Sequence, residues 1–213
     1  MRRITLLIYV GLVIPFVGVG QVANGLIYFE RQVKQASFEI PMKRFSETID
    51  YRVLQSKVKY YDEWGKKRKL RPKDAKEFRF TYQGEAIRMV SVPGISNIYK
   101  SKKKSEGDVF LKCELDGPVK LLKYFDPPQV VMAGNEGDGF TSKPILVSKR
   151  KVTYILMRKG LTLELRQPFS VKDIVLFFPD CPDLHEKARK KRFGNKDSFF
   201  VAKYYNENCA VTE

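Results

Sequence analysis

The sequence is poor in the residues that most enzymes and metal sites depend on. It has one histidine, His185, and its three cysteines show no C-x-x-C spacing. A general base needs a positioned partner, and no residue beside His185 provides one. One histidine does not complete the common structural zinc sets with these cysteines. We therefore assign no catalytic, metal-binding or cofactor-binding residue.

The apolar run at residues 4–19 is too short and too rich in glycine for a comfortable membrane span of roughly 20 residues. Arg2 and Arg3 precede it, and Gly18 and Gly20 supply the small residues of a cleavage site, a pattern typical of a secretory signal peptide. We expect cleavage before Gln21 and no transmembrane span afterwards. An uncleaved signal anchor is the alternative. The protein is thus expected in the periplasm, the outer envelope or the extracellular space.

Acidic residues are outnumbered, with 24 Asp and Glu against 40 Lys and Arg and a formal charge of +16. Such an excess indicates an anionic partner or surface. The candidate anionic-ligand surface consists of Trp64, Lys66, Lys67, Arg68, Lys69, Lys102, Lys103 and Lys104. Export argues against nucleic acid, so we expect an anionic glycan or an envelope protein as partner. Dispersed, solvated lysines are the alternative for the basic residues, and packing against a neighbouring strand is the alternative for Trp64.

Short runs of β-branched and aromatic residues between turn residues predict an α+β fold, mainly antiparallel β, as a meander, small barrel or sandwich-like sheet. We divide the chain into a signal peptide at 1–20, a segment of uncertain structure at 21–50, an antiparallel β region at 51–168 and a helical segment of the same domain at 169–213. Strands are expected at 51–61, 66–70, 77–82, 86–92, 145–148, 152–158 and 161–166, with one more at 26–29.

The stretch 110–125 predicts a central β-hairpin that turns at Asp116-Gly117. Pro118 has no N–H to close a two-residue loop, which favours a loop of four residues from Leu115 to Pro118. Either loop places Cys113 opposite Lys120, Leu111 opposite Leu122 and Val109 opposite Tyr124 on one apolar face. The other face is mixed and is expected near water.

Helices are expected at 171–178, from about 180 to 192 and from 196 to about 208, the last with an apolar stripe that packs on the sheet. Cys181 opens the second of these helices and Cys209 closes the third. Because a turn at Gly194-Asn195 folds the two helices back on each other, we expect a disulfide between Cys181 and Cys209. Cys113 is expected to be a free, buried thiol.

Four segments together resemble an uncharacterised family of exported proteins from Bacteroidota. They are RPKDAKEFRF at 71–80, the hairpin at 110–125, FPDCPDL at 178–184 and YYNENC at 204–209. The resemblance covers the chain from about residue 71 onward. It implies an exported, sheet-rich protein with helical C-terminal segments, and it supplies no catalytic residues.

The sequence thus indicates an exported cell-envelope protein that acts as a non-catalytic binding or structural module. A secreted enzyme with an unrecognised carboxylate site and a binder of anionic envelope polymers are the alternatives. Two converging buried acids would favour the enzyme, a basic face beside Trp64 the polymer binder, and an exposed apolar patch a protein partner.

Overall fold

The computed structural model describes residues 21–93, 107–125, 129–131, 145–147, 152–164, 171–190 and 197–210. Its main strands are β1 (Gln21–Tyr28), β2 (Val33–Ile40), β3 (Val58–Tyr61), β4 (Lys67–Leu70), β5 (Glu77–Tyr82), β6 (Glu85–Val92), β7 (Val109–Leu115), β8 (Val119–Phe125), β11 (Val152–Arg158) and β12 (Leu161–Glu164). They form one open antiparallel sheet in the order β12-β11-β8-β7-β6-β5-β1-β2-β3-β4. The predicted α+β class, mainly antiparallel β, is confirmed.

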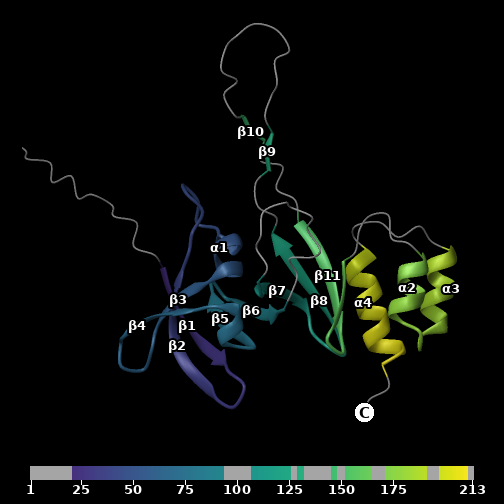
Figure 1. The fold of residues 1–213 in the computed structure, drawn as a ribbon, viewed down its shortest axis with the longest axis horizontal. Helices are drawn as coiled ribbons and strands as arrows, with labels where there is room; N and C mark the ends of the chain where they lie inside the picture. The colour runs from purple at the N-terminus through teal and green to yellow at the C-terminus, as the bar shows by residue number, and fades with distance from the viewer. Residues whose placement is uncertain are drawn as a thin grey trace, which may run out of the picture.

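Helices flank the sheet at two places (Figure 1). α1 (Tyr51–Ser56) packs on β7, and the 3₁₀ helix η1 (Pro72–Asp74) links β4 to β5. α2 (Val171–Phe177), α3 (Pro182–Lys190) and α4 (Asp197–Asn208) form the C-terminal helical segment, with α4 between the sheet and the other two helices. None of the described helices is long and apolar enough to cross a membrane.

The N-terminal part differs from the sequence prediction in two ways. Residues 21–50 contain a full hairpin, β1 with β2, of which only a strand at 26–29 was predicted. Residues 51–56 form α1 instead of the start of a strand. The carboxylate of Asp50 caps this helix at the N–H of Arg52, and Leu54 is wholly buried. A local cap and one buried side chain therefore outweigh the β-forming composition of this stretch.

The central hairpin exists, but the predicted register is wrong by two residues. Cys113 lies opposite Leu122, and a bulge at Glu114 leaves a loop of Asp116, Gly117 and Pro118. The backbone N–H and C=O of Val119 each bond to the side chain of Asn206 at 2.8 Å. Asn206 thus takes the place of the pairing that β7 would have supplied to the first residue of β8.

Because the register differs by an even number of residues, each side chain stays on the predicted face of the hairpin. The predicted apolar face is confirmed. Leu111 and Leu122 are wholly buried in one cluster against which Val109, Cys113 and Tyr124 pack. The opposite face was expected near water, and this was wrong. Phe110 joins a large core around β1 to β6, while Val119 and Leu121 join a second core beneath the C-terminal helices.

The larger core is enclosed by a curled sheet. Leu70 of edge strand β4 and Phe110 of β7 belong to this core although five strands lie between theirs in the sheet. Alternation along β2, β3 and β4 directs Phe38, Val58 and Leu70 into it. Lys34, Tyr60 and Arg68 continue the same inward-facing rows, so they lie at the end of this core.

Two small β elements lie apart from the main sheet. β9 (Gln129–Val131) pairs with β10 (Ile145–Val147). The predicted strand at 145–148 therefore belongs to a separate two-stranded sheet, whereas β11 and β12 form the expected hairpin through Lys159 and Gly160. Residues 1–20, where a signal peptide was predicted, and the predicted surface residues Lys102, Lys103 and Lys104 lie outside the described residues.

A chain of ion pairs joins β5, β6 and the central hairpin. Arg88 donates to the buried carboxylate of Glu77 and also to Asp116, and Lys120 binds Asp116 at 2.7 Å. Partial burial alone would raise the pKa of Asp116, but hydrogen bonds from Lys120 and Arg88 outweigh it and lower that pKa to about 2. Asp116 therefore stays charged well below neutral pH.

We expect Asp116→Asn to lower the free energy of unfolding at pH 7 by about 1 kcal/mol, a value discounted because the side chain is 55% exposed. The folded pKa is below the unfolded one, so the contribution is present above about pH 4 and is lost as pH falls toward 2. Urea unfolding at several pH values should show the gap between wild type and variant closing over that range. A gap that does not change with pH would contradict this role, and Glu63→Gln is the exposed control.

Candidate functional site

The turn between β3 and β4 displays the only tryptophan of the chain. Trp64 is 75% exposed, at the tip of the hairpin predicted from Asp62 to Gly65. The Asp62 carboxylate accepts hydrogen bonds from the N–H of Trp64 at 3.2 Å and of Lys66 at 2.8 Å. Gly65 completes the turn with a φ of 70°, a value that glycine adopts without strain. The tip is therefore ordered although its largest side chain faces solvent.

Beside this turn lies a hollow of about 290 Å³, which we call the Trp64 hollow. It is lined by Phe29, Gln32, Lys34, Gln35, Tyr60, Asp62, Glu63, Trp64 and Arg68. Phe29 and Tyr60 pack against the larger core, and the ring centroid of Tyr60 is 6.4 Å from that of Phe38. The hollow thus offers apolar ring surface at the end of a rigid core, with two cations and two amides around it.

Asp62 also fixes the guanidinium of Arg68. The Nε atom of Arg68 donates to Oδ2 of Asp62 at 2.9 Å. This hydrogen bond is the main reason why the pKa of Asp62 is lowered, and that of Arg68 raised. The two terminal nitrogens of Arg68 have no partner among the described residues. They form a positioned fork that suits a carboxylate.

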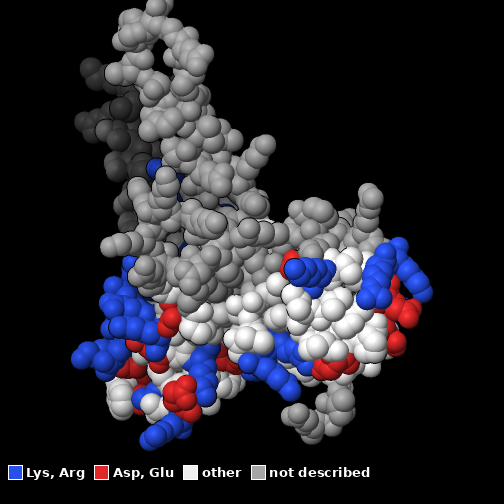
Figure 2. All heavy atoms as spheres, turned by 45° about the vertical axis from the view of Figure 1, so that its right-hand side comes forward, with Lys and Arg blue, Asp and Glu red and all other residues white. Residues whose placement is uncertain are grey.

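The predicted basic surface is only partly available for an anion. Lys67 pairs with Glu39, and Arg68 pairs through one edge with Asp62. Lys66 and Lys69 have no carboxylate partner among the described residues. Figure 2 shows blue and red side chains interspersed on the face it draws. The predicted surface also contained residues 102–104, which lie outside the described residues. Whether they approach Lys66, Lys67, Arg68 and Lys69 is therefore a part of the prediction that stays untested.

A second polar hollow of about 680 Å³ adjoins the first on the other face of the sheet. The two share Gln35, Asp62 and Glu63 as lining residues. The second is lined mainly by neutral side chains, including Asn24, Ser37 and Tyr61. The two hollows therefore meet at the turn, with aromatic rings lining the first and neutral hydrogen-bonding groups lining the second.

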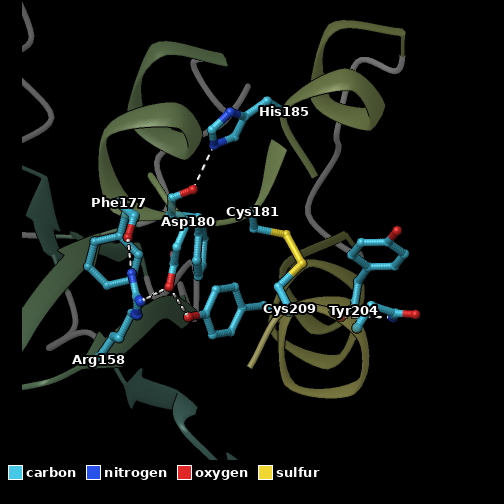
Figure 3. Close-up of a disulfide and its surroundings, with 10 residues drawn as sticks. Arg158, Phe177, Asp180, Cys181, His185, Tyr204 and Cys209 are labelled. Carbon is cyan, nitrogen blue, oxygen red and sulfur yellow. Dashed lines mark hydrogen bonds and ion pairs between the residues drawn. A yellow bond between two sulfur atoms is a disulfide. The ribbon is translucent and has the colours of Figure 1, made fainter. Parts of the chain in front are cut away.

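Cys181 and Cys209 lie at disulfide distance, with Cα atoms 5.5 Å apart, as expected (Figure 3). The carboxylate of Asp180 bonds to Arg158 of β11, and it accepts a hydrogen bond from Tyr205 at 2.8 Å. Burial of Tyr205, followed by this bond, raises the pKa of its hydroxyl, so the donor stays protonated. These contacts hold the turn before α3 to the sheet and to α4, which is a structural role.

The remaining reactive groups are also tied into the fold. His185 was expected at a solvated surface position, but it is half-buried, and its Nε2 lies 2.6 Å from the backbone oxygen of Phe178. Cys113 is a free thiol, half-buried instead of fully buried, and burial raises its pKa. In the described part of the chain, no three His, Cys, Asp or Glu side chains are grouped to hold a metal ion.

Sequence reasoning identified Trp64 and Arg68 but missed Phe29, Lys34 and Tyr60, which complete the hollow. The signal was present in β2, where inward positions Ala36, Phe38 and Ile40 extend back to Lys34 by simple alternation. It was hidden because β2 itself was not predicted.

The chain was also compared with known proteins. No protein-family model, no curated protein and no solved structure matches it.

Proposed function

We propose that the protein is a non-catalytic module of the cell envelope that binds an acidic glycan at the Trp64 hollow. The observation that carries this proposal is the 75% exposure of Trp64 beside a hollow that Phe29 and Tyr60 help to line. The flat, apolar faces of sugar rings pack against such aromatic surfaces, and these surfaces need little ordering on binding. The export signal pattern at residues 1–20 supports the envelope location.

The cations of the hollow favour an acidic sugar over a neutral one. Arg68 presents two nitrogens without a partner among the described residues, and Lys34 of β2 lines the same hollow. A carboxylate on the glycan would receive charge-assisted hydrogen bonds from the Arg68 fork. Because Asp62 and Glu63 also line the hollow, ring stacking is expected to contribute more to affinity than net charge.

The acids with shifted pKa values in the described part of the chain are held in their charged form. The described carboxyl groups with shifted pKa values are Glu39, Asp62, Asp116 and Asp180, and each pKa is lowered. These groups are held ionised by lysine, arginine and tyrosine partners.

Trp64→Ala is expected to weaken binding to polygalacturonate about tenfold, because a stacked ring contributes on the order of 1 to 2 kcal/mol. Arg68→Gln should weaken it about fivefold, whereas Arg68→Lys should recover only part of the loss since the fork is absent. Leu161→Ala is the matched control, since Leu161 is 68% exposed on the opposite edge strand. Isothermal calorimetry should compare the affinities of the wild type and the variants for polygalacturonate, for dextran and for a single-stranded DNA with the same charge as the polygalacturonate.

Three results would overturn the proposal. They are equal affinity of wild type and Trp64→Ala for polygalacturonate, equal binding of dextran, and tighter binding of the DNA with the same dependence on Trp64. The last would reassign the hollow to nucleic acid.

A further inference from the structure

The loop between β2 and α1 carries a phenylalanine, Phe45, that is almost wholly exposed. Phe45 is 94% exposed, more than any other large apolar side chain among the described residues. Single exposed apolar residues are ordinary on protein surfaces. The significance of Phe45 therefore depends on how the loop holds it.

This loop, residues 41–50, is a tightly bonded hairpin. The N–H of Lys43 donates to the oxygen of Thr48 at 2.9 Å, and that of Ser46 donates to the oxygen of Lys43 at 3.1 Å. The hydroxyls of Ser46 and Thr48 lie 2.7 Å apart. At the base, Asp50 N–H donates to the oxygen of Pro41 at 2.7 Å. These bonds fix the backbone on both sides of Phe45.

Phe45 is the third residue of the turn from Lys43 to Ser46 and has a φ of 59°. Turns with a positive φ at this position favour glycine or asparagine, because a Cβ atom is crowded there. The chain instead holds a bulky ring in a strained conformation and directs it into solvent. Strained backbone conformations cluster at functional sites, which makes this position a candidate for a contact role.

Two unpaired cations accompany the ring. Lys43 and Arg44 have no carboxylate partner among the described residues, and the guanidinium of Arg44 lies 5.0 Å from the ring centroid of Phe45. Asp50 is already engaged by Arg52. Glu47, also exposed, is the remaining acid of the loop.

We propose that the Phe45 loop docks on the surface of an anionic lipid bilayer. The ring enters the boundary between headgroups and acyl chains, and Lys43 and Arg44 meet the lipid phosphates. An aromatic side chain beside cations matches this interface, which is apolar on one side and anionic on the other. The proposal is independent of the glycan site, since Trp64 lies on a different hairpin.

A unique fluorescent reporter tests the contact. Trp64 is the single tryptophan, so the double variant Trp64→Phe, Phe45→Trp of the chain that begins at Gln21 carries its only indole at the loop tip. With vesicles of phosphatidylcholine containing phosphatidylglycerol, its emission should shift to the blue and be quenched by brominated lipid. The control Trp64→Phe, Leu161→Trp should show neither effect. An unshifted reporter at position 45, or equal quenching at both positions, would overturn the proposal.

Vesicle co-sedimentation measures how much each side chain of the loop contributes to lipid binding. Phe45→Ala should reduce partitioning about tenfold, and Lys43→Gln or Arg44→Gln about fivefold each. Glu47→Gln should increase it because a like charge to the lipid is removed. Phe45→Gly should lose as much binding as Phe45→Ala while its unfolding midpoint stays equal or rises, since glycine relieves the strained φ. Equal partitioning of wild type and Phe45→Gly, or no preference for phosphatidylglycerol, would contradict the lipid contact.

Discussion

Replacing both Cys181 and Cys209 with alanine is expected to lower the free energy of unfolding by about 3 to 4 kcal/mol. The two residues are 28 positions apart, so the bridge removes a large loop-closure entropy from the unfolded chain. Cys181 is also wholly buried, and the segment before it supplies Asp180 to Arg158 and Tyr205. Loss of the bridge should therefore loosen α3 and α4 from the sheet.

Guanidinium denaturation of the protein and of Cys181→Ala, Cys209→Ala measures this effect. Cys113→Ala is the control, because this thiol has no disulfide partner and should cost less than the double change. Alkylation of the unreduced, denatured protein should label one cysteine, Cys113. Three labelled cysteines, or superimposable denaturation curves, would contradict a stabilising bridge.

Gly117→Ala should destabilise the protein by about 3 kcal/mol through the joint between the central hairpin and α4. Gly117 has a φ of 146°, and a Cβ atom added there would lie 2.5 Å from Nδ2 of Asn206. Asn206 in turn bonds to both backbone groups of Val119, a wholly buried residue. A methyl group at Gly117 must therefore displace the side chain that satisfies them.

A double-mutant cycle separates the clash from the strained φ. Asn206→Ala alone should cost about 2 kcal/mol, because two buried backbone groups lose their partner. In the double variant Asn206→Ala, Gly117→Ala the clash is absent. Its loss of unfolding free energy should therefore be at least about 1 kcal/mol smaller than the sum of the two single losses. Additive losses in urea unfolding would show that Asn206 does not restrict position 117.

Sequence periodicity predicted the strands that carry clear alternation but not the contacts between distant segments. Phe78, Phe80 and Tyr82 share one face of β5 as expected, because pleat geometry alone places them there. The register of the central hairpin depended on Asn206, which is 87 residues away from Val119. No local rule in the hairpin sequence indicates that a helix residue will bond to its first strand position.

Contacts between distant segments also explain why α1 and the candidate site were not predicted in full. Residues 51–56 have strand-forming composition, yet Gln55 is buried and bonds to both backbone groups of Phe125. For the site, the turn at Asp62 to Gly65 was predictable, and Trp64 was placed in the candidate anionic-ligand surface, with packing against a neighbouring strand as the alternative. The hollow itself required the pairing of β2 with β3, which sets Lys34 and Tyr60 on the same face.

Residues of the four motifs that suggested a family contact one another in the folded protein. Phe178 packs on Tyr205 with ring centroids 4.9 Å apart, and Cys181 lies at disulfide distance from Cys209. Asn206 holds the central hairpin, and Glu77 of the first motif shares Arg88 with Asp116 of that hairpin. Their described contacts thus account for stability, whereas the Trp64 hollow lies outside them.

Trp64 reports directly on the site proposed to bind glycan, because no other tryptophan contributes to its emission. Titration of the protein with oligogalacturonate should give a saturable change in Trp64 emission, retained in Phe45→Ala and weakened about fivefold in Arg68→Gln. Dextran of similar length should give no such change. Binding of oligogalacturonate without any change in Trp64 emission, or an equal response to dextran, would contradict the assignment of the Trp64 hollow as an acidic-glycan site.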